Sequence, residues 1–266
     1  MIKTIPFGKT NIQFSDTGSG TALVLIHGYL ESLHIWEYFT GEFKENYRVI
    51  CPDLPGHGNS GVVGEVHGMN KLADSVIAVL DHCGIDKCFV AGHSMGGYTA
   101  LAMLEYFPER LLGLCLFHSH PFPDTKQTRQ NRCREIVLVN QGRKELISKI
   151  NIPKAFASES CESFRPEINR ATNIAIKTPD AGIIACLKGM MERPSREKVL
   201  SETDLPVLVI AGKYDNYIDY ETVARGIPLP SNAEFVTLEK SGHIGFIEEK
   251  EKAASAISDF IRRKCK

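Results

Sequence analysis

Short apolar runs alternate with segments of helical periodicity along most of the chain. The apolar runs are bounded by turn residues and cover positions 22–26, 47–51, 88–91, 111–117, 206–211 and 234–238. Runs that are continuous rather than alternating are typical of strands buried on both faces of a sheet. The segments with helical periodicity are 71–83, 95–107, 218–225 and 252–264. This alternation predicts an α/β fold, in which helices cover both faces of a mostly parallel sheet.

Two segments depart from the alternation. Residues 3–16 predict an antiparallel hairpin at the sheet edge, whereas residues 119–202 contain no convincing strand and several amphipathic helical stretches. In 180–192 the helical spacing applies to Ile183, Ile184, Leu187, Met190 and Met191. We therefore expect one core formed by 1–118 and 203–266, with 119–202 inserted as a helical lid. Such a lid would lie over the carboxyl edge of the sheet, where ligands bind in open α/β folds.

The charge balance narrows the class of partner. The chain of 266 residues has 31 basic and 32 acidic residues, a formal net charge of -1, so no basic surplus favours nucleic acid or an anionic membrane. Its apolar runs are far shorter than the roughly 18 residues of a spanning helix, and its N-terminus has no signal-peptide pattern. We expect a cytoplasmic protein with a small-molecule ligand, and we interpret the basic residues at 262–266 as a helix end that complements the helix dipole.

The eight cysteines are scattered and have no Cys-x-x-Cys spacing that could bind zinc or support a redox cycle. Several of them, such as Cys115, lie within apolar runs. We therefore expect buried free thiols rather than disulfides or metal ligands.

The motif Gly92-His93-Ser94-Met95-Gly96-Gly97 joins an apolar strand to a helix. A strand that reverses abruptly into a helix brings its two arms so close that side chains two places from the bend would collide, and Gly92 and Gly96 relieve that collision. The turn lifts Ser94 to the carboxyl edge of the sheet at a helix N-terminus, where developing negative charge is favoured. This setting predicts that Ser94 is a nucleophile.

In this setting the motif resembles the nucleophile elbow of the α/β-hydrolase superfamily, and is most similar to small esterase, C–C hydrolase and haloperoxidase-like members. The resemblance implies an eight-stranded sheet and the chain order nucleophile, acid, histidine. Asp215 comes just after a strand and His243 comes after the last strand, which makes them the expected acid and base. Two other acids stay open: Asp124, which follows an earlier strand that some members use, and Asp219, in the next helix.

The resemblance also implies an oxyanion hole formed by the backbone N–H groups of Tyr29 and Met95. The Tyr29 side chain is interpreted as part of the pocket wall. His93 is beside the nucleophile but is expected to point away from it. His118 and His120 are at the lid entrance and are candidates for substrate binding, alongside a purely structural role for both.

These expectations predict a serine hydrolase that cleaves a small carboxylic ester through an acyl-enzyme, with no metal or organic cofactor. C–C bond hydrolysis, thioester hydrolysis and perhydrolysis use the same triad and remain alternatives. Epoxide hydrolases and haloalkane dehalogenases carry aspartate at the nucleophile position, so Ser94 disfavours both. A ligand-binding receptor with incidental turnover is the alternative from a different class.

Overall fold

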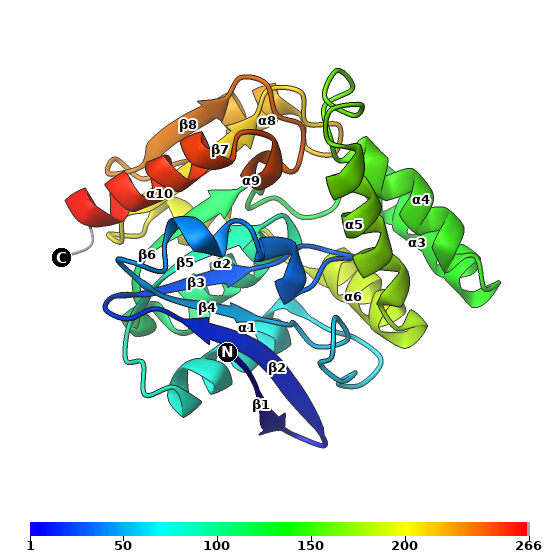
Figure 1. Cartoon of the computed structure of the whole chain (residues 1–266), viewed down its shortest axis with the longest axis horizontal. Coiled ribbons are helices and arrows are strands. Elements are labelled where there is room, and N and C mark those ends of the chain that lie inside the picture. Colours follow the sequence, from blue (N-terminus) through cyan, green and yellow to red (C-terminus); the bar gives the residue numbers. More distant parts are fainter. Residues whose placement is uncertain (265–266) are drawn as a thin grey trace.

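The computed structural model describes residues 1–264, and its centre is an eight-stranded sheet (Figure 1). The spatial order of the strands is β1-β2-β4-β3-β5-β6-β7-β8. Their bounds are β1 Ile2–Phe7, β2 Thr10–Thr17, β3 Ala22–Ile26, β4 Arg48–Pro52, β5 Cys88–His93, β6 Leu111–Phe117, β7 Val207–Gly212 and β8 Glu234–Leu238. The β1–β2 and β2–β4 pairs are antiparallel and all other neighbours are parallel. The predicted edge hairpin and mostly parallel sheet are confirmed.

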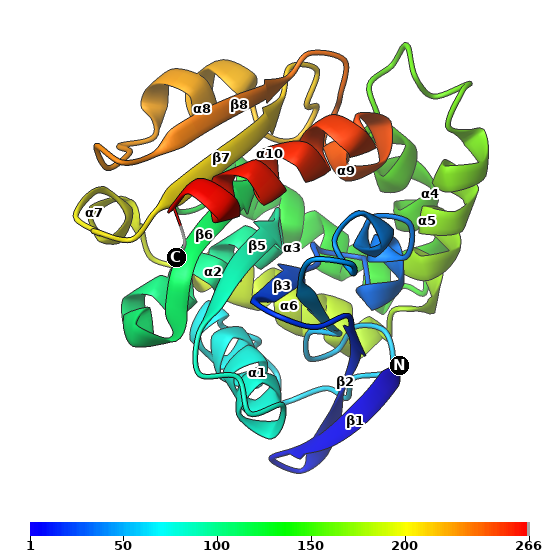
Figure 2. The same cartoon turned by 60° about the vertical axis from the view of Figure 1, so that its left-hand side comes forward.

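The central strands are continuous apolar runs because both of their faces are covered. Every residue of β3, β5 and β7 is buried. The helices that belong to this core are α1 Met69–His82, α2 Met95–Tyr106, α8 Tyr220–Gly226, α9 Gly245–Glu248 and α10 Lys250–Lys264. Helix α10 packs on β6, β7 and β8, whereas α1 and α2 cover the opposite face (Figure 2). Loops and the segment 119–202 lie at the carboxyl ends of the parallel strands.

Some helix boundaries differ from the sequence pattern. The helix predicted at 218–225 begins at Tyr220, because the Asp219 carboxylate accepts a hydrogen bond from the Thr222 N–H (2.8 Å) and caps the helix. The last helix begins at Lys250, two residues before its apolar pattern suggested. Its final turn carries Arg262, Arg263 and Lys264, and the remaining two residues of the basic end, Cys265 and Lys266, lie outside the described part of the chain.

Residues 119–202 are helical, and no strand occurs between these two positions. Their helices are α3 Lys126–Asn140, α4 Lys144–Lys154, α5 Arg165–Lys177, α6 Asp180–Glu192 and α7 Glu197–Ser201. Figure 1 shows α3 to α6 grouped beyond the carboxyl ends of the parallel strands. Of the five apolar positions predicted to form one face of α6, Ile183, Leu187 and Met190 are buried, whereas Ile184 and Met191 are only half-buried.

Helix α6 is seated directly on the core. A Cβ atom at Gly182 would lie 2.1 Å from the carbonyl oxygen of Gly56, so only glycine permits this approach of two backbones. The His67 N–H donates to the carbonyl of Ala185 in α6 (2.9 Å). These contacts fix α6 against the loop after β4.

The seven cysteines within residues 1–264 are all free. Cys51, Cys88, Cys115 and Cys186 are buried as expected, but Cys133 in α3 is exposed. Among these residues, no helix has both the length and the apolar character needed to cross a membrane.

Candidate active site

Ser94 is the turn between β5 and α2. Its φ of 51° and ψ of -112° lie in a region that residues other than glycine rarely adopt. The strain follows from the tight reversal, because a Cβ at Gly92 would lie 2.2 Å from the Gly96 carbonyl oxygen and a Cβ at Gly96 would lie 2.2 Å from that of Ile26. The two glycines are therefore required for steric reasons, and the reversal holds Ser94 at the start of α2.

Asp215 and His243 meet in space although 28 residues separate them. Asp215 follows β7, and His243 is in the loop after β8. The distance from His243 Nδ1 to Asp215 Oδ2 is 2.7 Å, and the side chains are 8% and 3% exposed. Because a carboxylate can only accept, His243 Nδ1 carries the proton and leaves Nε2 free to accept one.

The surroundings of Asp215 favour its charged form. Burial alone would raise the pKa of this carboxyl, but its electrostatic attraction to His243 and hydrogen bonds from His118 and His243 outweigh burial and hold the pKa well below its usual range. The backbone N–H groups of Tyr217 and Ile218 also donate to Oδ1, at 2.8 and 2.9 Å. Asp215 therefore remains ionised throughout the neutral range.

A buried ion pair links three loops around this pair. The His93 Nε2 donates to the carbonyl oxygen of His243 (2.8 Å), and its Nδ1 lies 3.0 Å from Glu31 Oε2. The same Glu31 oxygen accepts from the Gly28 N–H at 2.5 Å. Burial lowers the pKa of His93, but the charge of Glu31, the hydrogen bonds to Glu31 and to the His243 carbonyl, and the charge of Asp215 together outweigh burial, and the net shift of the pKa is upward. The loop after β3, the turn at Ser94 and the His243 loop are thus held together. Both ring nitrogens of His93 are occupied by these contacts with Glu31 and His243, and Glu31 had no signal in the sequence.

Ser94 and His243 line one cavity of about 860 Å³. Tyr29 contributes to its wall from the loop after β3, and helices α3 to α6 supply the wall opposite the sheet. Among the residues contributed by these helices are Arg132, Glu135, Ile152, Ala171 and Met190. The cavity lies between the insertion and the loops at the carboxyl ends of the strands, so a small molecule held there would contact both.

Known proteins resemble this chain in sequence and in fold. The family model described as the alpha/beta hydrolase fold matches residues 21–132. The chain is 27% identical over 244 residues to 3-oxoadipate enol-lactonase 2 of Acinetobacter baylyi, covering 91% of this chain and 89% of that protein. It superposes on an esterase of Thermogutta terrifontis, solved with malate bound, with a TM-score of 0.94, 28% identity and full coverage of both chains. The chain therefore has the α/β-hydrolase fold, and these similarities support a hydrolase.

Another relative of this α/β-hydrolase is the dihydrolipoyllysine-residue acetyltransferase component of the acetoin cleaving system of Pseudomonas putida. The two are 26% identical over 244 residues, which are 92% of this chain. The chain spans only 64% of the length of that relative.

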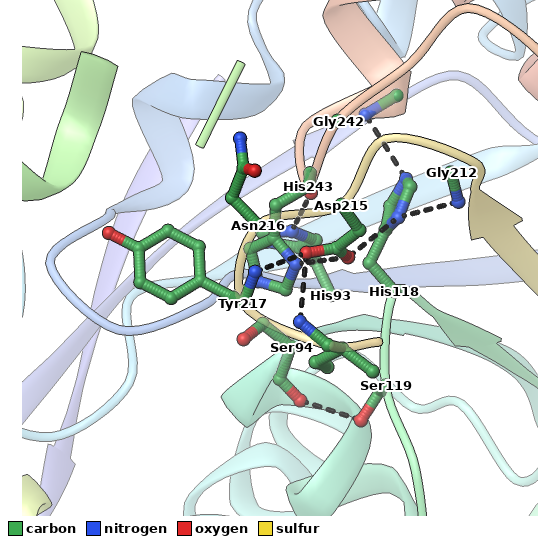
Figure 3. A network of polar contacts seen from close by, with 12 residues as sticks. His93, Ser94, His118, Ser119, Gly212, Asp215, Asn216, Tyr217, Gly242 and His243 are labelled. Atoms are coloured by element: carbon green, nitrogen blue, oxygen red, sulfur yellow. Dashed lines mark hydrogen bonds and ion pairs between the residues drawn. The ribbon is translucent and has the colours of Figure 1, made fainter. Parts of the chain in front are cut away.

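The two histidines expected at the substrate differ in position in this α/β-hydrolase. His120 lines the cavity, its Nδ1 accepts from the Phe122 N–H (3.2 Å), and burial together with the charge of Arg193 lowers its pKa to about 4. His118 is not among the cavity-lining residues, and its side chain is fully buried behind Asp215 (Figure 3). The expected substrate contact of His118 is therefore corrected, because its position at the end of β6 turns the ring toward β7.

The two alternative acids of the α/β-hydrolase are occupied elsewhere. Asp124 forms ion pairs with Arg132 and Arg193, and Asp219 caps α8. Neither has a hydrogen bond to His243. His118, Asp215 and His243 are also the one group within residues 1–264 whose ligand atoms lie close enough to hold a metal ion, but Asp215 Oδ2 and both histidine Nδ1 atoms already face one another at hydrogen-bonding distances.

Proposed function

We propose that this α/β-hydrolase is a serine hydrolase that cleaves small carboxylic esters, with Ser94 as nucleophile, His243 as general base and Asp215 as the acid that orients it. The observation that carries the proposal is the 2.7 Å hydrogen bond between His243 Nδ1 and Asp215, combined with a strained Ser94 on the wall of the cavity that His243 also lines. The arrangement has the parts of an acyl-transfer site: a nucleophile, a base with a free nitrogen and a charged group behind it.

The proposed reaction begins when His243 Nε2 takes the Ser94 proton while Oγ attacks the ester carbonyl. The tetrahedral intermediate collapses as the imidazolium returns that proton to the leaving alcohol, and an acyl-serine remains. Water, deprotonated by the same imidazole, then attacks the acyl carbon and releases the acid. Asp215 stays ionised and stabilises the imidazolium in both halves.

The oxyanion would be held by the backbone N–H groups of Tyr29 and Met95. Met95 is the first residue of α2, where N–H groups lack partners within the helix. Tyr29 is in the loop after β3, the strand that pairs with β5. The dipole of α2 adds to the stabilisation of negative charge at this end of the helix.

The insertion 119–202 is proposed as the lid of the site, and Met190 tests this role. Met190 is 2% exposed and lines the cavity, whereas its neighbour Met191 does not line it and contacts the Cys133 thiol. Met190→Glu is expected to raise KM for longer acyl esters, several-fold for each methylene of the acyl chain that contacts the lid. The kcat for an acetate ester should change little, because its acyl group has no such methylene.

Met191→Glu is the matched control and is expected to keep the wild-type acyl preference. Circular dichroism checks that both variants fold, and Met190→Gln provides a milder change if the charge prevents folding. An unchanged acyl-length profile in folded Met190 variants would argue that α6 is scaffold only.

The proposed function is tested by a panel of esters that vary in acyl length and aromaticity, together with a thioester, a carbon–carbon diketone and peracid formation. Multiple turnover of small esters with the highest kcat/KM supports the proposal. Faster turnover of the diketone or the thioester would assign the same residues to a different reaction. Slow turnover with tightly retained product would instead favour a ligand-binding role.

A further inference from the structure

We infer that His118 is a positioning residue, whose neutral imidazole donates its Nδ1 proton to Asp215 and holds the carboxylate in register with His243. The inference rests on the proposed function, because it gives Asp215 the role of orienting acid. Neither the motif around Ser94 nor the order of nucleophile, acid and histidine points to this residue, and it stands one position beyond the end of β6.

The backbone of His118 is held in an unusual conformation. Its φ of 47° is in the left-handed region, which is uncommon for residues other than glycine and asparagine. Its N–H donates to the carbonyl of Ile210 in β7 (2.8 Å), so the strand pairing continues through the residue. This conformation directs the ring toward the end of β7, where Asp215 follows, and such strain persists where surrounding contacts compensate for it.

Three groups surround the ring nitrogens of His118. Asp215 Oδ2 is 3.4 Å from Nδ1, the Gly212 N–H is 3.1 Å from Nδ1, and the Gly245 N–H is 3.1 Å from Nε2. A proton on Nδ1 satisfies the carboxylate and leaves Nε2 to accept from Gly245. A proton on Nε2 would face the Gly245 N–H and would turn a lone pair of Nδ1 toward the carboxylate. The Nδ1–H tautomer satisfies the carboxylate and Gly245 but faces the Gly212 N–H, whereas the Nε2–H tautomer satisfies Gly212 alone. The charged carboxylate attracts a proton more strongly than a backbone N–H repels one, which favours the Nδ1–H tautomer.

The ring carries a single proton at neutral pH. Burial lowers the pKa of His118 to about 4, against the opposing effect of the Asp215 carboxylate. The other titratable groups that face it are the imidazoles of His243 and His93, and both disfavour a second positive charge. His118 is therefore a fixed neutral donor over the range in which an ester hydrolase works, and it does not compete with His243 as a base.

The carboxylate of Asp215 is held on both oxygens. Oδ1 accepts from the backbone N–H groups of Tyr217 and Ile218, while Oδ2 accepts from His243 and lies within reach of His118 (Figure 3). The two imidazoles converge on one oxygen. Without His118, Oδ2 would depend on His243 alone, and the carboxylate would follow the imidazole when that ring moves during proton transfer.

The fold provides a fitted space for this imidazole. A Cβ at Gly245 would lie 2.6 Å from His118 Nε2, so a larger residue there would displace the ring. On its face, the ring stacks on Phe117 with 5.1 Å between centroids and 18° between planes. The ring is thus restrained from its edge and its face, which a positioning role requires.

Three substitutions separate the contacts of His118. Asparagine places its amide nitrogen the same number of bonds from Cα as Nδ1, so His118→Asn retains a donor for Asp215 and tolerates the positive φ. Glutamine places its amide at the distance of Nε2, so His118→Gln retains only the acceptor for Gly245. His118→Leu removes both groups.

We expect kcat for a small ester to fall about 10- to 100-fold in His118→Gln and His118→Leu, the range for a lost hydrogen bond to a charged group, with KM nearly unchanged. The acidic limb of the kcat/KM profile should move to higher pH in both, because the charge of Asp215 then acts on His243 without a competing donor. His118→Asn should restore kcat and the profile to near wild-type values. His82→Asn, at an exposed histidine at the end of α1, controls for the substitution itself.

The decisive arm is a double-mutant cycle with Asp215→Asn. If His118 acts through Asp215, His118→Leu should have little further effect on kcat in that background. Equal losses in His118→Asn and His118→Leu, wild-type kcat and pH profile in all three variants, or full additivity with Asp215→Asn would overturn the inference. The proposed function fails by a different result, namely no ester turnover by the wild-type protein or retained turnover in Ser94→Ala.

Discussion

Ser94→Ala is expected to lose ester hydrolysis by on the order of 10⁶-fold in kcat while it keeps the thermal stability of the wild-type protein. The hydroxyl is the group that forms the acyl-enzyme, and no neighbouring side chain can replace it. Ser94 is half-buried at the cavity wall, so the change removes no core packing. The measurement is steady-state turnover of a chromogenic acetate ester, with the thermal midpoint recorded for both proteins.

Ser195→Ala, at an exposed serine before α7, serves as the matched control and should retain full activity. Residual turnover in Ser94→Ala above about 1% of the wild-type rate would show that another nucleophile acts. Loss of folding in Ser94→Ala would leave the activity result without meaning, which is why the thermal midpoint belongs to the same experiment.

Asp215→Asn is expected to reduce kcat by on the order of 10⁴-fold with the fold intact. An asparagine amide that keeps the contact to His243 Nδ1 favours the wrong tautomer, in which Nε2 carries the proton and cannot act as a base. The pKa of Asp215 lies well below its usual range, so the wild-type carboxylate is charged throughout the assay range. The kcat of the variant, measured from pH 5 to 9, should therefore stay low across the whole profile rather than recover at one end.

Asp124→Asn distinguishes the two acids. Asp124 is held by Arg132 and Arg193 rather than by His243. Its replacement removes a buried partner of two guanidinium groups. We expect a lower thermal midpoint and an altered KM, with kcat within about tenfold of wild type. A severe loss of kcat in Asp124→Asn together with a mild one in Asp215→Asn would contradict the assignment of the acid.

The sheet and the turn at Ser94 could be predicted because their signals are local. A strand buried on both faces is apolar at every position, and the predicted bounds of β3, β6 and β8 are those observed. Gly92 reflects the close approach of Gly96 across the bend, and Gly96 reflects the close approach of Ile26 at the end of β3. Helix α6 likewise has the bounds that its proline and apolar spacing indicated.

The contacts that support the site residues, namely those of His118 with Asp215 and of Glu31 with His93, could not be predicted. They join segments that only the order of the strands in the sheet brings together. His118 meets Asp215 through the parallel pairing of β6 with β7, and Glu31 meets His93 across two loops that are 62 residues apart. A histidine or glutamate in a loop has no periodic signal that reveals such a partner. The sequence accordingly suggested substrate contact for His118, where the structure has a buried ring.

The central claim is that Ser94 is the activated nucleophile, and an organophosphorus reagent tests it most directly. Its tetrahedral phosphorus resembles the intermediate of ester hydrolysis, so the site should react with it far faster than any other serine. We predict complete loss of ester turnover with one adduct per chain, which peptide mass spectrometry maps to the segment containing Ser94. An adduct on any other of the serines with Ser94 unmodified, or retained activity after stoichiometric labelling of Ser94, would contradict the account.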